Sequence, residues 1–224
     1  MNVENKVFQM KKNNYSYIGI SFIVLLFGIY SIPKIVKHFQ KADLHTFNKV
    51  PDFEFINQDG KTITNDSYKG KVYVVEFFFS TCPTICPIMN TKMLSLQDKF
   101  LGNPNFGIAS FSITPDIDTP EVLKEYTKRH KISHKNWHLL TGKPDSEVYA
   151  LSNKGFKLYA GKGDESHSGF EHSGLFALVD KDGYIRSRYD EHGNPIMFYR
   201  ALDEQGFPDQ IQELKQDIKL LLNE

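Results

Sequence analysis

The pattern of apolar and polar positions divides the chain into an apolar N-terminal segment and a longer region. In the longer region, patterns typical of strands alternate with patterns typical of helices. Residues 71–79 are almost continuously apolar and rich in β-branched and aromatic residues, which predicts a strand buried on both faces. Between Met89 and Leu101 the apolar positions recur at helical spacing, and Gly102-Asn103-Pro104 would end that helix. We therefore predict a strand, a turn and a helix in succession.

The alternation continues through the second half of the chain. A βαβ series of this kind indicates a mainly parallel central sheet. The turn Lys181-Asp182-Gly183 between two late apolar runs predicts an added antiparallel hairpin, so the fold class is α/β with a central mixed sheet. The predicted strands cover residues 106–113, 137–140, 175–180 and 184–190, and the predicted helices cover residues 119–129 and 211–222.

The N-terminal apolar segment, residues 13–33, carries no charged side chain. As a helix rising about 1.5 Å per residue it would extend roughly 30 Å, which is the thickness of the hydrocarbon core of a bilayer. Lysines flank it on both sides: Lys11, Lys12, Lys34 and Lys37. We expect an N-terminal tail over residues 1–12, a single transmembrane anchor over residues 13–33, a linker over residues 34–49 and a folded domain over residues 50–224.

Other interpretations of this segment fit less well. A cleaved signal peptide needs small residues at the cleavage site, and Gly28 and Ser31 are poorly placed for that role. A buried core helix would normally show a polar face, which is missing here. Lipoprotein processing is excluded because the first cysteine is Cys82. The flanking lysines are balanced, so the positive-inside rule does not orient the segment.

Composition narrows the range of functions. The chain has 27 basic and 27 acidic residues, so no overall field would attract nucleic acid, and we expect no nucleic-acid partner. Two cysteines in 224 residues are too few for a disulfide scaffold. Their close spacing predicts a local chemical site instead.

The two cysteines lie in the run Thr81-Cys82-Pro83-Thr84-Ile85-Cys86-Pro87, at the junction of the predicted strand and helix. Positions i and i+4 on a first helical turn face the same way, about 5–6 Å apart. Such a pair either forms a disulfide or converges on one metal ion. The helix N-terminus favours thiolates, and Pro87 suits a first turn. Two buried core cysteines with no function would not explain this placement.

A metal bound by two thiolates needs a third ligand, for which histidine is the natural candidate. His167 and His172 lie in the Gly- and Ser-rich residues 161–174, which lead into the predicted strand 175–180, and spacing does not choose between them. Two sulfurs with one imidazole favour copper, especially Cu(I), although zinc with a water is chemically possible. Four further histidines are interpreted as linker or solvated surface: His38, His45, His130 and His134.

Over residues 50–222 the chain resembles the Sco/SenC family, membrane-anchored thioredoxin-like proteins that help to assemble the binuclear copper centre of cytochrome c oxidase. Residues 79–87 resemble the family's Cys-Pro-x-x-Cys-Pro signature. The resemblance implies a thioredoxin-like fold and selects His172 as the copper histidine. Thr114 and Glu171 stand where the family commonly has aspartate. Supporting similarity comes from residues 111–115, 118–120, 137–142, 172–173 and 175–180.

The resemblance implies a copper-binding metallochaperone in which Cys82, Cys86 and His172 hold Cu(I) or Cu(II). It implies delivery to the copper-accepting subunit of cytochrome c oxidase at the membrane, with the C-terminal domain outside the cytoplasm, on the periplasmic side of the inner membrane. Other copper carriers or thioredoxin-like reductants are further expected partners. The His172→Ala change should then abolish copper binding.

The sequence also allows comparison with three other functions: a thiol–disulfide oxidoreductase, a peroxidase and a structural tether. In a membrane-anchored thiol–disulfide oxidoreductase the same cysteines would cycle and reduce the oxidase subunit's cysteines, so the sequence leaves open whether the protein is an enzyme. A peroxidase needs one low-pKa cysteine, which fits the paired motif poorly. A purely structural tether leaves the cysteine turn unexplained.

Overall fold

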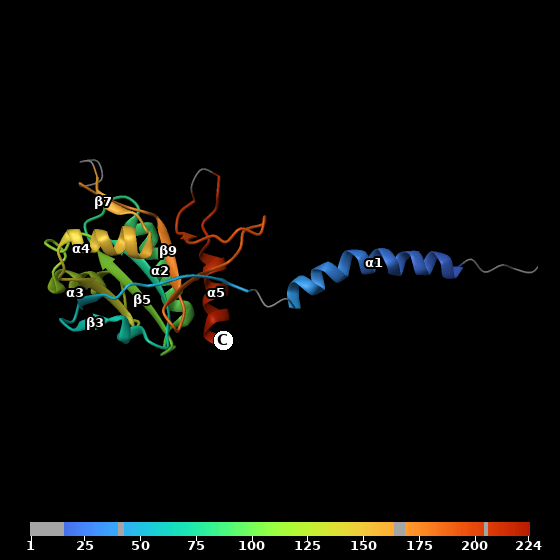
Figure 1. Cartoon of the computed structure of the whole chain (residues 1–224), viewed down its shortest axis with the longest axis horizontal. Helices are drawn as coiled ribbons and strands as arrows, with labels where there is room; N and C mark the ends of the chain where they lie inside the picture. The colour runs from blue at the N-terminus through green and yellow to red at the C-terminus, as the bar shows by residue number, and fades with distance from the viewer. Residues whose placement is uncertain (1–15, 40–42, 164–168, 204–205) are drawn as a thin grey trace, which may run out of the picture. The chain divides into compact units, whose positions relative to one another are not determined.

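The computed structural model describes residues 16–39, 43–163, 169–203 and 206–224, and the chain divides into two compact units, Met1–Ala42 and Asp43–Glu224 (Figure 1). In the first unit the described element is helix α1, Ser16–Phe39. No helix in the described part of the chain is long and apolar enough to cross a membrane. The transmembrane anchor predicted over residues 13–33 is therefore not supported. Residues 1–15, with the predicted tail, lie outside the described residues.

The second unit is built on a mixed sheet of nine strands, in the order β1-β10-β9-β4-β5-β6-β2-β3, with β11 paired to β9. Strands β4, β5 and β6 run parallel at its centre and the other pairings are antiparallel, as the sequence predicts. The strands are β1 (His45–Lys49), β2 (Glu54–Asn57), β3 (Thr62–Thr64), β4 (Val72–Phe78), β5 (Phe106–Ser112), β6 (Trp137–Thr141), β9 (Leu175–Val179), β10 (Tyr184–Ser187) and β11 (Tyr199–Arg200).

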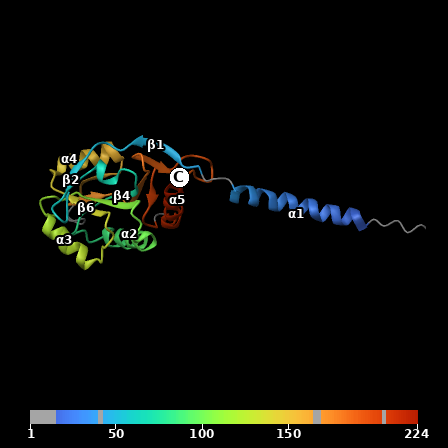
Figure 2. The same ribbon diagram turned by 90° about the horizontal axis from the view of Figure 1, so that it is seen from below.

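Helices cover both faces of the sheet. The crossovers from β4 to β5 and from β5 to β6 advance in the same direction, so the right-handed rule places α2 and α3 on one face, with α4 on the other (Figure 2). Helix α5 packs against α2 and β4. The helices are α2 (Cys86–Phe100), α3 (Pro120–Arg129), α4 (Asp145–Ala150) and α5 (Ile211–Asn223), with a 3₁₀-helix at Asn65–Tyr68 and a π-helix at Leu151–Phe156 after α4.

Strand β4 lies at the centre of the hydrophobic core. All seven of its residues are buried, because helices cover both faces of this central strand. Its Phe77 ring stacks on Phe111 of β5 at 5.3 Å between ring centroids, and both rings contact Phe156. The loop that carries the cysteines begins at the carboxyl end of this buried strand. The packing of the core therefore fixes the position at which the loop begins.

Several elements were not predicted from the sequence. Strand β1 begins at His45, inside residues 34–49 where a linker is expected, and it extends the sheet at one edge. A separate two-stranded sheet joins β7 (Ala160–Lys162) to β8 (Phe170–His172). These strands are short, and β7 contains Gly161, so neither shows the alternating pattern that identifies longer strands.

Candidate metal centre

The cysteine turn differs in one respect from the prediction. Helix α2 begins at Cys86, so Cys82 lies in the preceding loop and not on the first helical turn. The loop folds back so that the Cys86 backbone N–H donates to Cys82 Sγ over 3.5 Å. Pro87 occupies the first turn as predicted. The positive end of the helix dipole therefore faces the Cys82 sulfur.

The third donor comes from the β7–β8 hairpin. The Nε2 atom of His172, at the end of β8, lies 2.9 Å from Cys86 Sγ, and its Nδ1 lies 3.2 Å from the carbonyl oxygen of Ser173. The ring of Phe79 packs edge-on against the imidazole at 5.8 Å between centroids. Spacing left His167 and His172 as alternatives. The structure brings His172 to the cysteines, while His167 lies outside the described residues.

The two sulfurs have different environments. Cys86 is 4% exposed, whereas Cys82 is only partly buried, and neither is in a disulfide. The pKa of Cys82 is lowered, first because the Cys86 thiol donates a hydrogen bond to its sulfur, with further help from His172 and the Cys86 N–H. Burial raises the pKa of Cys86. The reduced, metal-free site thus holds a thiolate at Cys82 and a thiol at Cys86.

This asymmetry predicts selective alkylation of the reduced, metal-free protein. Between about pH 6 and pH 8, Cys82 should react with iodoacetamide at least about 100-fold faster than Cys86, since the thiolate is the nucleophile. Peptide mass spectrometry after a time course would measure both rates. The unfolded protein serves as the reference for the intrinsic reactivity of each cysteine. Equal alkylation rates of Cys82 and Cys86 in the folded protein would contradict the assignment of a thiolate to Cys82 and a thiol to Cys86.

The three donor atoms suit one soft metal ion. All lie within 4.8 Å of one another. An ion about 2.0–2.3 Å from each nitrogen or sulfur ligand requires donor separations below roughly 4.6 Å, so the set is nearly preformed. Two thiolate sulfurs and one imidazole are a donor set suited to copper. No other group of three or more such ligands occurs among the residues that the structure describes.

Comparison with known proteins shows which family this chain resembles. The SCO1/SenC family model matches residues 41–205, which is well over half of the chain. The chain belongs to the SCO1/SenC family. The SCO1 protein homolog of Bacillus subtilis is 38% identical over 143 residues, covering 63% of this chain and 74% of the relative. A SCO2-like protein of Rickettsia typhi is 34% identical over 142 residues, covering 61% and 68%.

Solved SCO1/SenC structures share the thioredoxin-like fold. BsSco, whose structure was used to identify a disulfide switch in a member of the Sco family of cytochrome c oxidase assembly proteins, is 32% identical with a TM-score of 0.65, covering 82% of this chain and 98% of that one. Yeast Sco1 with copper bound is 21% identical with a TM-score of 0.55, covering 77% and 90%. At that identity the likeness concerns the fold alone.

A buried carboxylate fixes the start of the cysteine loop. Asp118 is fully buried and accepts hydrogen bonds from the Ser80 backbone N–H at 3.1 Å and from the Ser80 hydroxyl. The hydroxyls of Ser112 and Thr114 donate to it at 2.6 and 3.0 Å. Thr114 thus supplies a donor and adds no second carboxylate beside Asp118. The role of Asp118 was not predicted, because its partner Ser80 lies 38 residues away in the sequence.

Removal of this carboxylate should destabilise the fold. In Asp118→Ala, four donors would lose their acceptor, two on half-buried Ser80 and two on buried Ser112 and Thr114. The expected cost is about 3 kcal/mol in the free energy of unfolding. Denaturant titration of the reduced protein measures this change. Asp116→Ala removes an exposed carboxylate from the same loop and should alter stability by less than about 0.5 kcal/mol. Similar stability of the two variants would show that the network contributes little.

Behind the cysteines lies a second buried acid that sequence analysis also missed. Glu76 is 5% exposed, accepts a 2.7 Å hydrogen bond from the Ser110 hydroxyl and lines a small cavity with Cys86. The Trp137 indole N–H donates to the same hydroxyl at 3.0 Å. Burial raises the pKa of Glu76 to about 7. The sequence signal for this buried acid was the position of Glu76 within the largely apolar predicted strand 71–79.

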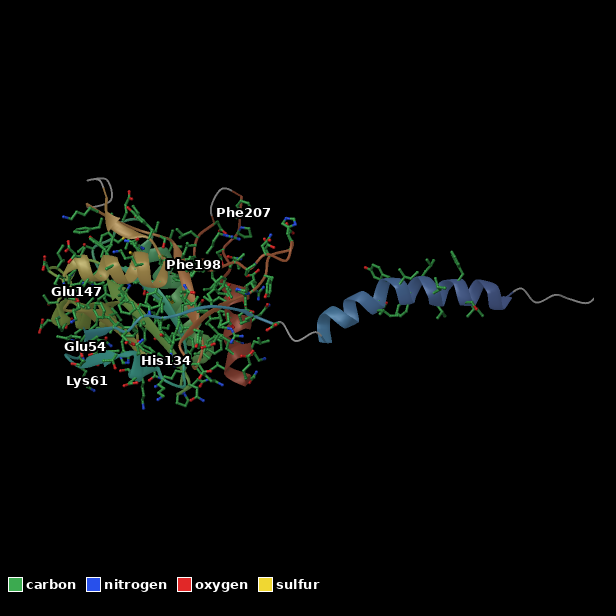
Figure 3. All side chains as sticks on the ribbon, in the orientation of Figure 1. Glu54, Lys61, His134, Glu147, Phe198 and Phe207 are labelled. Carbon is green, nitrogen blue, oxygen red and sulfur yellow. The ribbon has the colours of Figure 1, made fainter. Side chains whose placement is uncertain are left out.

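Among the described residues, no other histidine belongs to the group of metal-ligand candidates. His45 is in β1, with Nδ1 3.2 Å from the Tyr189 hydroxyl, and His130 pairs with Asn90. The interpretation of His134 as solvated surface is wrong, because the residue is 5% exposed and its Nε2 lies 3.3 Å from the Phe100 carbonyl oxygen. Figure 3 labels His134 among the side chains of this domain. Glu171 lines the groove beside Cys82 and His172, as expected for a carboxylate near the ligands.

Proposed function

We propose that this protein binds one copper ion through Cys82, Cys86 and His172 and delivers it to the copper-accepting subunit of cytochrome c oxidase. The observation that carries the proposal is the convergence of two sulfurs and one imidazole nitrogen within 4.8 Å. Membership of the SCO1/SenC family supports it, as does the Sco family's description as cytochrome c oxidase assembly proteins.

The unequal exposure of the ligands gives a route for transfer. Cys82 borders a groove of about 380 Å³ whose lining is largely apolar, while Cys86 and His172 are buried. A thiolate of the acceptor reaches copper from the groove and displaces Cys82 first. Cys86 and His172 keep hold of the ion until a second acceptor ligand replaces them, so copper is never free in solution.

Thiol–disulfide exchange is a second candidate function for the same sulfurs. Two observations favour it: both cysteines are free and adjacent, and the pKa of the more exposed one is lowered. Cys82 attacks a disulfide of the partner, forms a mixed disulfide and releases one partner thiolate. Cys86 then attacks Cys82, which leaves the partner fully reduced and this protein oxidised. An external dithiol of thioredoxin type returns it to the reduced state.

Copper titration of the reduced full-length protein tests the main proposal. Cu(I) presented in a competing chelator should bind in a 1:1 ratio, and Cu(II) should give a sulfur-to-copper charge-transfer band. Zinc serves as the comparison ion and should bind more weakly, as the order of divalent metal affinities predicts. Absence of copper binding by the reduced protein would reject the proposal and leave thiol exchange as the function.

The location of the domain stays a prediction. Membership of the SCO1/SenC family favours a location of the domain outside the cytoplasm. A topology reporter fused after Glu224 should read as non-cytoplasmic. A cytoplasmic reading would overturn this part of the proposal.

A further inference from the structure

The arm that carries His172 is structurally separate from the main sheet. Strands β7 and β8 form their own two-stranded sheet, and β8 pairs with β7 alone among the described strands. The position of the imidazole therefore depends on what holds β7. In the register of the hairpin, Ala160 of β7 lies directly opposite His172.

The hydrogen-bond pattern shows which way the backbone of Ala160 faces. The Ser173 N–H donates to the Tyr159 carbonyl oxygen at 2.8 Å, so the residues on either side of the Ala160–His172 pair make the bonds between the strands. In an antiparallel ladder, hydrogen-bonded and non-hydrogen-bonded pairs alternate. The N–H and C=O of Ala160 consequently point away from β8, toward the outer edge of the hairpin.

The side chain of Asn153, in the π-helix, satisfies both of these groups. Its Oδ1 accepts from the Ala160 N–H at 3.2 Å, and its Nδ2 donates to the Ala160 carbonyl oxygen at 2.7 Å. One amide thus takes the place of a neighbouring strand along the open edge of β7. Next to it, Ser152 makes the equivalent pair of bonds to Leu158, one through its backbone carbonyl and one through its hydroxyl.

We propose that Asn153 is a positioning residue for copper, which fixes β7 through Ala160 and thereby holds His172 within reach of the two sulfurs. The inference rests on the proposed copper site. Asn153 touches none of the three donors in the contacts described, so its effect passes through the backbone pair. Because its side chain is on the exposed surface of the domain, its loss leaves no cavity in the core.

The test compares Asn153→Ala with a matched control in the full-length protein. Asn65→Ala also removes one accepted and one donated backbone hydrogen bond, since Asn65 accepts from the Phe53 N–H at 2.8 Å and donates to the Pro51 carbonyl oxygen at 3.0 Å. Asn153→Asp retains the acceptor for the Ala160 N–H and loses the donor, so it should be intermediate. Cu(I) competition titrations, Cu(II) electron paramagnetic resonance and amide exchange of the metal-free protein are the readouts.

Asn153→Ala should bind Cu(I) about 10-fold more weakly, the effect typical of losing an outer-shell partner. Its Cu(II) spectrum should lose or weaken the nitrogen hyperfine splitting, and the Ser173 amide should exchange faster in the metal-free protein. Asn65→Ala should keep the unmodified copper affinity and spectrum. If Asn153→Ala does not fold, Asn153→Asp carries the test, with a smaller loss of affinity and the same spectral change expected.

Two results would overturn the inference while the proposed function stands: copper binding by Asn153→Ala with unchanged affinity and spectrum, or equal weakening by Asn153→Ala and Asn65→Ala. The second would mean that general stability, and not the position of His172, governs affinity. If the unmodified protein binds no copper, the proposed function fails and the inference fails with it, so the two failures are distinguishable.

Discussion

Replacement of any one of the three donors should lower copper affinity by more than about 100-fold, beyond the roughly 10–100-fold that loss of an outer-shell partner typically causes. Cys86→Ala removes the buried sulfur, which lies 2.9 Å from His172 Nε2. Cys82→Ala removes the sulfur that is already a thiolate in the metal-free site. Chelator competition with the reduced proteins measures the affinities.

His172→Ala separates the two candidate functions. It should lose copper affinity in the same way, while disulfide exchange with a small-molecule disulfide should largely survive, since both sulfurs remain. His45→Ala is a suitable control, because His45 lies in β1 and contacts Tyr189. Unchanged copper affinity in His172→Ala would exclude the imidazole from the site, and a parallel loss of exchange activity would show that the imidazole also activates Cys82.

The pH dependence of stability should reveal Glu76. Its pKa is raised from 4.5 to about 7 in the folded protein by burial, so the folded state keeps this proton after the unfolded state has lost it. The contribution of Glu76 to the free energy of unfolding therefore falls as pH rises from 4.5 to about 7, and it is constant above that range. A shift of this size corresponds to about 3 kcal/mol.

Glu76→Gln should remove this slope. The amide oxygen still accepts from the Ser110 hydroxyl, and no charge has to be buried above pH 7. Between about pH 4 and pH 8, the free energy of unfolding of the variant should rise by about 3 kcal/mol relative to that of the unmodified protein. Denaturant unfolding of the reduced, metal-free proteins measures this difference. Glu121→Gln is the control. Its carboxylate is on the surface and its pKa is lowered, so its titration falls below this window. Parallel curves for Glu76→Gln and the unmodified protein would contradict the assignment.

The sequence alone determined the central architecture and the reactive pair. The run from residue 71 to 79, the cysteine turn and the helix after it were predicted because strand burial, turn chemistry and helical spacing are local properties of the chain. The structure confirms β4, α2 and the mixed sheet, and the spacing of Cys82 and Cys86 already indicated a shared site.

Tertiary structure decided the rest. His172 is 86 residues from Cys86, so the approach of Nε2 to Sγ at 2.9 Å depends on how the β7–β8 hairpin folds against the cysteine loop. Burial raises the pKa values of Cys86 and Glu76, and the hydrogen bond from the Cys86 thiol is the first cause of the lowered pKa of Cys82. The role of Asp118 likewise comes from donors on other segments. Burial and long-range hydrogen bonds are properties of the folded chain, and residue spacing does not encode them.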